Sequence, residues 1–368
     1  MKPSGSAANR RKAMKILVIG PSETKAHGGI STVIRVIRES EPLNQEFEID
    51  VFPSYIDGSL LVRLLYSAYG YFRFLLKFRN YDLFHINTAE KGSTFRKNLY
   101  LKAIKRAGKK AIVHIHGAEY LNFYDTLSSF RKRIVDDFFH QADLVLALSD
   151  NWKKELEQRA HITTCRTLNN GVNTLTFRAA FTDVTEHRDS FLMLGRLGAR
   201  KGVYDLIDAA EIAIRQNPNL KVCLAGDGDV ENVRKLVAQR GLEKNITVPG
   251  WISRIEKLSY LKKASTVVLP SYYEGLPMSL LEGMAAGKAI ISTTVGAIPE
   301  MITEENGILI KPGDVSALAE GLLRCSTDMN MLKSMSQKNM EKAENVFSVR
   351  RMHAQLAEYY RQVMQQDG

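Results

Sequence analysis

The sequence predicts an α/β protein in which two doubly wound domains, each with a parallel sheet and crossover helices, face each other across a cleft. The first observation is length, because 368 residues exceed one ordinary core and favour two domains of roughly 150–200 residues. The second is composition, with 45% hydrophobic and 25% charged residues, as in globular proteins. The third is pattern. Short apolar runs alternate with Gly-rich or polar turns and longer helical stretches, which is typical of parallel strands joined by helices.

The apolar runs divide into two groups, each sufficient for a sheet. In the first half we expect strands at 15–19, 47–52, 83–86, 111–115, 144–147 and 164–168. In the second half we expect them at 191–194, 221–225, 246–248, 266–269, 289–292 and 307–310. Polar residues interrupt the apolar rhythm at 173–190, which indicates a linker. The predicted order is a leader at 1–13, Rossmann-like domains at 14–175 and 176–348, and a C-terminal helix at 349–368 that returns to the first domain.

Charge and cysteine usage restrict the class of protein. The cysteines Cys165, Cys223 and Cys325 are far apart, so neither a disulfide framework nor a cysteine zinc site is indicated, and a reducing cytoplasm is expected. Residues 1–150 contain 23 Lys and Arg against 15 Asp and Glu, a balance of +8, whereas the rest has 28 against 25. The first half should therefore face an anion. No apolar run approaches the ~18–20 residues that cross a bilayer.

Two glycine-containing loops follow predicted strands and precede helices. Gly28 and Gly29 follow the first strand, where glycine lets the backbone approach a phosphate. Gly195, Arg196 and Lys201 follow strand 191–194, and two cations at a helix N-terminus suit a diphosphate. An ordinary turn and a solvated basic loop are the respective alternatives.

A third loop follows strand 266–269 and carries two carboxylates eight residues apart. Glu274 lies in the loop with Gly275, Leu276 and Pro277, and Glu282 lies about one turn into the next helix. One carboxylate can accept hydrogen bonds from sugar hydroxyls and the other from a ribose diol. The alternative is that Glu274 caps the helix and Glu282 is a surface residue.

Together these loops resemble glycosyltransferase family 4, retaining enzymes of the GT-B fold, of a bacterial cell-envelope or polysaccharide type. The resemblance runs in order over residues 15–345 and includes 169–172, 226–228 and 296–300. It implies that Arg196 and Lys201 bind the donor diphosphate. It also implies that Glu274 and the backbone at 275–277 contact the donor sugar, and that Glu282 binds the nucleotide ribose.

The resemblance has further implications for the site. The loop at Gly29 would close over the phosphates, and His116 matches the family's cleft histidine near the reacting centre, although a lone histidine is as often structural. We expect Gly250 and Trp251 to contact the base of the nucleotide. We also expect the donor nucleotide to be UDP, the commonest one in nucleotide sugars. The resemblance implies no essential metal or other cofactor, and Asp227-Gly228-Asp229 has the sequence of an ordinary turn. The N-terminal domain would bind the acceptor and the C-terminal domain the nucleotide sugar.

Two segments of the first half could lie on an anionic bilayer. Basic residues repeat at helical spacing on one segment, and an aromatic-rich segment at 60–78 carries a narrow basic strip. The proposed membrane or acceptor face consists of Arg63, Arg73, Lys77, Lys102, Lys105, Arg106, Lys109 and Lys110. The alternatives are a solvated helix face for the first segment and a helix packed in the core for the second.

The predicted function is transfer of a hexose-type sugar from a nucleotide diphosphate sugar to a glycan or lipid-linked acceptor. The protein would be cytoplasmic and peripheral on the inner membrane face. A nucleic-acid partner is not expected, because no recognition motif accompanies the basic residues. A non-catalytic carbohydrate- or nucleotide-binding protein on the same fold, a sugar-nucleotide epimerase and a phosphorylase are the alternatives.

Overall fold

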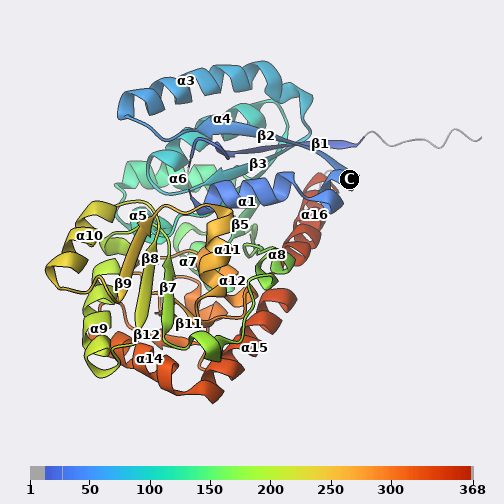
Figure 1. Ribbon diagram of the computed structural model, residues 1–368. Coiled ribbons are helices and arrows are strands. Elements are labelled where there is room, and N and C mark those ends of the chain that lie inside the picture. Colours follow the sequence, from blue (N-terminus) through green and yellow to red (C-terminus); the bar gives the residue numbers. More distant parts are fainter. Residues whose placement is uncertain (1–12, 27, 366–368) are drawn as a thin grey trace, which may run out of the picture.

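The computed structural model describes residues 13–26 and 28–365, which form two α/β lobes (Figure 1). The predicted leader lies outside the described residues except for its last residue. Each lobe is built on one six-stranded sheet, and all strand pairs are parallel.

The N-terminal sheet has the strand order β2-β1-β3-β4-β5-β6. Its strands are β1 (Met14–Pro21), β2 (Phe47–Tyr55), β3 (Leu83–Thr88), β4 (Lys110–Ile115), β5 (Leu144–Ala147) and β6 (Cys165–Thr167). The connecting helices are α1 (Gly29–Arg38), α2 (Glu41–Glu46), α3 (Leu60–Lys77), η1 (Phe78–Asn80), α4 (Gly92–Arg106), α5 (Tyr120–Asp125), α6 (Ser129–His140) and α7 (Asp150–Ala160).

The C-terminal sheet has the order β12-β11-β10-β7-β8-β9 and follows α8 (Thr174–Arg178) and η2 (Val184–His187). Its strands are β7 (Ser190–Leu194), β8 (Lys221–Ala225), β9 (Ile246–Gly250), β10 (Thr266–Leu269), β11 (Ala289–Thr293) and β12 (Ile308–Ile310). Its helices are η3 (Ala199–Lys201), α9 (Val203–Gln216), α10 (Val230–Gln239), α11 (Arg254–Lys262), α12 (Met278–Ala285), α13 (Ile298–Met301), α14 (Val315–Thr327) and α15 (Met329–Asn345).

The predicted α/β fold with two Rossmann-like halves is confirmed, and every strand coincides with a predicted apolar run. The physical reason is that parallel sheets are covered by helices on both faces, so their strands are apolar without interruption. In β3 and β10 every residue is buried. The stretch interpreted as a linker contains the short helices α8 and η2, and the buried Phe177, Ala180 and Val184 attach it to the C-terminal core.

The last helix, α16 (Val349–Gln365), packs on the N-terminal sheet (Figure 1). Its buried Met352, Leu356 and Tyr360 join the cluster that contains Ile16 and Leu83. The chain thus crosses between the lobes twice. At the crossings, the Val172 N–H donates to the Phe347 carbonyl at 2.7 Å and the Val349 N–H donates to the Val172 carbonyl at 3.0 Å.

The loops after the strands bring the two sheets together at their carboxyl ends. The Asn170 side chain, after β6, donates to the Leu276 carbonyl, after β10, at 2.9 Å. The Glu300 carboxylate, after β11, accepts from the backbone N–H groups of Asp150 and Asn151 at 3.0 and 2.9 Å. Ligands of open parallel sheets bind outside the carboxyl ends of the strands. The edge shared by the two lobes is therefore where a ligand site is expected.

Candidate active site

The Gly28 and Gly29 loop of the N-terminal lobe reaches the C-terminal lobe. Gly29 is the first residue of α1, directly after the β1 loop. A Cβ built on Gly29 would lie 3.9 Å from Cγ of Met278, the first residue of α12. The loop predicted to close over the phosphates therefore faces the N-terminus of the helix that carries Glu282.

His116 lies at the end of β4 and is neutral. Its Nε2 donates to Asn87 Oδ1 at 2.8 Å, an orientation set by the Asn87 amide donating to the Ile19 carbonyl at 3.4 Å. Burial, and to a lesser degree the nearby His85, lower the pKa of His116 to about 3. With Nε2 protonated, Nδ1 carries the lone pair and can accept a hydrogen bond.

The loop at 195–202 holds the two predicted diphosphate cations in different surroundings. Arg196 is 71% exposed and its guanidinium lies 3.7 Å from Asp227. The side chain of Lys201 is 14% exposed, and its ammonium forms an ion pair with Glu274. Gly202, at φ 69°, ends the loop, and a Cβ there would lie 2.0 Å from the Pro270 carbonyl oxygen. This close approach places Lys201 beside the loop that follows β10.

Glu274 is buried in the contact between the lobes. Besides Lys201, it accepts a hydrogen bond from the Ser271 hydroxyl at 2.7 Å. A Cβ on the next residue, Gly275, would lie 3.4 Å from the His116 carbonyl oxygen and 3.0 Å from Leu148. The structure thus brings His116, Glu274 and Lys201 to one place. The alternative in which Glu274 caps α12 is wrong, because the N-cap is Pro277 and no side chain caps this helix.

The backbone after Glu274 offers hydrogen-bond donors. Among the described residues, no acceptor is found for the N–H groups of Gly275 and Leu276. Both residues are buried, and they precede the N-terminus of α12, which carries a partial positive charge. This arrangement can bind a phosphate oxygen or a sugar hydroxyl.

Glu282 is buried in α12, so the alternative of a surface residue is wrong. Both of its carboxylate oxygens accept from Lys257 Nζ, at 2.8 and 2.9 Å. Gly250, at φ 87°, ends β9, and its carbonyl accepts from the Gly226 N–H at 2.8 Å. Trp251 follows it with 63% of its surface exposed. The predicted contacts of Glu282, Gly250 and Trp251 with the nucleotide stay predictions.

The acidic pair in the 226–229 turn has side-chain partners. Asp227 pairs with Arg196, and Asp229 accepts from the Tyr204 hydroxyl. Within the described residues, no group of three or more His, Cys, Asp or Glu is arranged to hold a metal ion.

The segment at 60–78 is not a core helix, so that alternative is wrong. Only Gly70 and Phe74 of α3 are buried. Large apolar side chains cover the rest and are exposed: Leu60, Leu61, Val62, Leu64, Leu65, Tyr69, Phe72, Leu75 and Leu76. Of the residues that the structure describes, no helix combines the length and hydropathy needed to cross a membrane.

The basic residues around α4 are only partly available to a partner. Lys105 pairs with Asp143 at 2.6 Å, and Lys110 lies 3.5 Å from the same carboxylate. Arg106 is exposed, whereas Lys102 and Lys109 are half-buried. The predicted stripe therefore contributes less free charge than its sequence suggests.

Several residues of the site were not anticipated. Asn87 sets the His116 tautomer, Ser271 supports Glu274 and Lys257 neutralises Glu282. A polar residue at the carboxyl end of a predicted strand could have indicated Asn87. Nothing in the sequence pairs Lys257 with Glu282, because they lie on different helices, 25 positions apart.

Comparison with known proteins gives matches along most of the chain. Residues 28–175 match the family described as Glycosyltransferase Family 4, and residues 180–342 match Glycosyl transferases group 1. The chain is 26% identical over 336 residues to the UDP-Gal:alpha-D-GlcNAc-diphosphoundecaprenol alpha-1,3-galactosyltransferase of Escherichia coli, covering 85% of this chain and 84% of that protein. It is 26% identical over 282 residues to the alpha-D-kanosaminyltransferase of Streptomyces kanamyceticus, covering 70% and 71%.

A solved structure supports the fold. HepE of Anabaena, in complex with UDP, aligns with a TM-score of 0.74 over 95% of this chain and 100% of that chain, at 19% identity. At this identity the likeness concerns the fold alone. Two family matches in the expected order, on two facing Rossmann-like lobes, make this chain a glycosyltransferase of family 4 with the GT-B fold.

Proposed function

We propose that this chain is a retaining, metal-independent hexosyltransferase that uses a UDP-sugar donor and a lipid-linked or polysaccharide acceptor. The observation that carries the proposal is the Lys201–Glu274 ion pair beside the unpaired N–H groups of Gly275 and Leu276. It joins the predicted diphosphate cation, the predicted sugar carboxylate and a set of backbone donors at one point of the shared edge.

The reaction breaks the bond between the anomeric carbon and the diphosphate oxygen, and the electron pair leaves with the diphosphate. Arg196 and Lys201 would stabilise that developing charge more than the ground state, which lowers the barrier. An ammonium has three donors, so Lys201 can keep Glu274 while it binds a phosphate oxygen. The acceptor hydroxyl attacks the same face of the sugar and its proton passes to the departing diphosphate. Neutral His116 would hydrogen-bond a reacting hydroxyl through Nδ1.

The donor and acceptor classes rest on the relatives. The Escherichia coli relative is named for UDP-Gal and for an acceptor linked to a lipid through a diphosphate. The cations already described fit a nucleoside diphosphate without a metal ion, because fixed positive charge replaces it.

The exposed face of α3 supports a membrane location for the acceptor. Apolar side chains point outward over the length of the helix, and the flanking charges Arg73 and Lys77 are both positive. No acidic residue occurs in α3. An apolar face with basic flanks fits the interface of an anionic bilayer. The protein would thus lie on the cytoplasmic membrane face with its N-terminal lobe toward the lipid.

Incubation of the chain with a panel of nucleotide sugars and a sugar-diphosphate-lipid acceptor, with a chelator present, tests this function. We expect one UDP-sugar to give a glycosylated lipid whose new bond keeps the donor's anomeric configuration by NMR. An inverted product, isomerised donor or binding without turnover would contradict it.

A further inference from the structure

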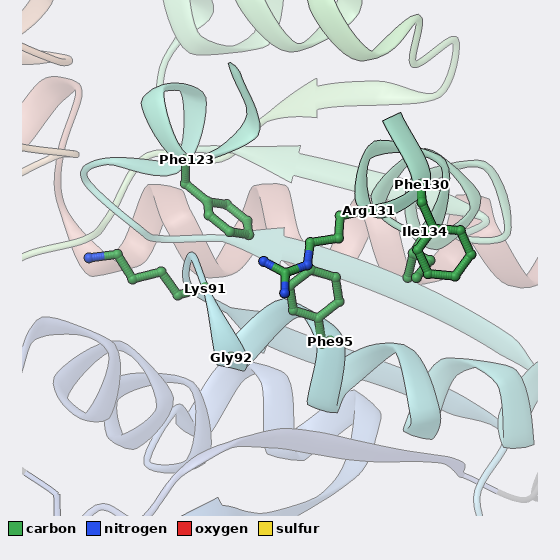
Figure 2. Close-up of a pocket in the computed structure, with 7 residues that line it drawn as sticks. All are labelled: Lys91, Gly92, Phe95, Phe123, Phe130, Arg131 and Ile134. Atoms are coloured by element: carbon green, nitrogen blue, oxygen red, sulfur yellow. The ribbon is translucent and has the colours of Figure 1, made fainter. Parts of the chain in front are cut away.

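A pocket in the N-terminal lobe lies outside the residues used so far. Its volume is about 440 Å³, and it opens between the start of α4, α5 and α6. Figure 2 shows it extending from Lys91, past Phe123, Arg131 and Phe95, to Phe130 and Ile134. Lys91 and Gly92 follow β3 and Phe123 follows β4, so the pocket begins at the same carboxyl edge as the active site.

The walls of the pocket are apolar and its charged residues are cations. Phe95 and Phe123 meet edge to face with centroids 6.2 Å apart, and Phe130 is 73% exposed. Of the residues that the structure describes, no acidic one lines the pocket. Among the described residues, no hydrogen-bond or ion-pair partner is found for the side chain of Lys91 or of Arg131. Such a pocket suits a molecule that is apolar at one end and anionic at the other.

Lys91 has an unusual backbone. Its φ is 62° and its ψ is −133°, a backbone region that residues with a side chain rarely adopt. A glycine would relieve this strain, yet the chain places a cation there, at the N-cap of α4. Strain at a ligand-facing residue is typical of binding sites.

Glu90 connects the pocket to His116. A Cβ on Gly117, the residue after His116, would lie 1.8 Å from Glu90 Oε2, so the two loops are packed together. Glu90 Oε2 is buried and has no hydrogen-bond partner among the described residues. The order from the active site outward is therefore His116, a carboxylate that can accept from a sugar hydroxyl, a cation and an apolar pocket.

We propose that this pocket binds the diphosphate and the first isoprenoid units of a polyprenyl diphosphate-linked sugar acceptor. This assignment rests on the proposed function. The sugar would lie at His116 and Glu90, the diphosphate at Lys91 and Arg131, and the hydrocarbon against Phe95, Phe123, Phe130 and Ile134. His116, Glu90 and Lys91 follow the covalent order of such an acceptor, which is sugar, diphosphate, lipid, and Arg131 reaches between Phe95 and Phe123 (Figure 2). The helix α4, which lines the pocket, also packs against α3, where Tyr100 of α4 lies against Gly70.

Isothermal titration of the full chain with farnesyl diphosphate tests the pocket without requiring turnover. UDP at saturation is included in a second series, so that binding at the donor loop is separated from binding at the pocket. Lys91→Gly and Arg131→Gln should each weaken farnesyl diphosphate about tenfold, because each removes a charge-assisted contact. Phe123→Ala should weaken farnesyl diphosphate but not inorganic diphosphate. Arg133→Gln, on the same helix and outside the pocket, is the matched control and should change the affinity by less than about twofold.

Lys91→Gly should leave the melting temperature unchanged or raise it, since glycine accepts the backbone conformation. The pocket assignment is overturned if inorganic diphosphate binds as tightly as farnesyl diphosphate, or if Arg133→Gln weakens binding as much as Arg131→Gln. A chain that binds farnesyl diphosphate through these residues but transfers no sugar contradicts only the proposed function. A chain that transfers sugar with an unchanged acceptor KM in Lys91→Gly and Arg131→Gln contradicts only the pocket.

Discussion

Arg196 and Lys201 come from one short loop but differ in what surrounds them. Arg196 is mostly exposed and its one carboxylate neighbour, Asp227, is itself 43% exposed. Lys201 is nearly enclosed, and its partner Glu274 has only 6% of its side chain exposed. Removal of one member of a buried pair leaves an uncompensated charge, whereas a surface charge can be removed at little cost. Replacing Arg196 and replacing Lys201 should therefore have different effects on stability and similar effects on catalysis.

We expect Arg196→Ala to lower kcat about a hundred- to a thousandfold, the usual effect of losing one donor to a developing anion. Its melting temperature should stay unchanged. Lys201→Ala should lower kcat similarly and also lower the melting temperature, since Glu274 loses its partner. Steady-state kinetics and thermal unfolding measure both quantities. Arg215→Ala, which removes an exposed residue paired with Glu211, is the control. Near-normal kcat in both loop variants would contradict their assigned role.

Among the elements, β3 and β4 carry the buried His85 and His114, and the half-buried His116 directly follows β4. His85 Nδ1 is hydrogen-bonded to the Tyr360 hydroxyl of α16 at 2.8 Å, and His85 Nε2 lies 3.2 Å from His114 Nδ1. The rings of His114 and His116 have centroids 3.9 Å apart. Burial lowers the pKa of His85 to about 3 and that of His114 well below its usual value. Stacked neutral rings thus join α16 to the centre of the N-terminal sheet.

This histidine stack predicts acid sensitivity. The folded pKa values lie below the usual 6.5, so the unfolded chain binds more protons and stability is lost as pH falls from about 6.5 towards 3. Each histidine contributes up to about 1.4 kcal/mol per pH unit to the slope. Urea unfolding between pH 7.5 and 5 measures it. His85→Gln should reduce the slope, whereas His140→Gln, at an exposed position, should not. An equal slope in His85→Gln and the parent would contradict this account.

The exposed apolar face of α3 predicts binding to membranes. Leu61, Leu65, Phe72 and Leu76 are each at least 63% exposed, so replacing all four by Gln should remove little packing. We expect loss of sedimentation with vesicles containing phosphatidylglycerol and an unchanged melting temperature. Ile255→Gln, at an 82% exposed residue of α11, is the control and should sediment like the parent. Undiminished sedimentation of the fourfold variant would show that α3 does not contact the lipid.

The sequence predicted the strands better than the surroundings of single residues. Strands such as β10 are buried on both faces, so their apolar runs are visible without knowledge of their neighbours. The helix α3 is apolar around most of its circumference, and periodicity therefore could not separate a core helix from one with an exposed apolar face. The partners of Lys201 and Glu282 depend on loop approach over 73 and 25 positions, which no local pattern encodes.

For the whole molecule, contact between the lobes determines whether the site is assembled. Gly275 lies against the His116 carbonyl and Leu148, so a larger side chain there would separate the lobes. We expect Gly275→Val to lower kcat/KM by at least about a hundredfold, since even about 1 Å of misplacement has an effect of this size. Each lobe should keep its fold by circular dichroism. Gly321→Ala is the control, because Gly321 has no positive φ and its Cβ would meet only ordinary contacts at 3.5 Å or more. Full activity in Gly275→Val would mean that the lobes need not touch there.

The two chain crossings at Val172 and Ser348 have a consequence for motion. They form a parallel bridge, and Gly171 packs so tightly on Val349 that a Cβ would lie 2.8 Å from its Cα. The lobes are joined by two chain segments that are hydrogen-bonded to one another, and these segments define a single axis of rotation. Admission of a donor would then turn one lobe about that axis. Fluorescent dyes placed on the two lobes far from this axis would report a changing distance between the lobes. Dyes placed on the two lobes beside the axis would report a constant distance.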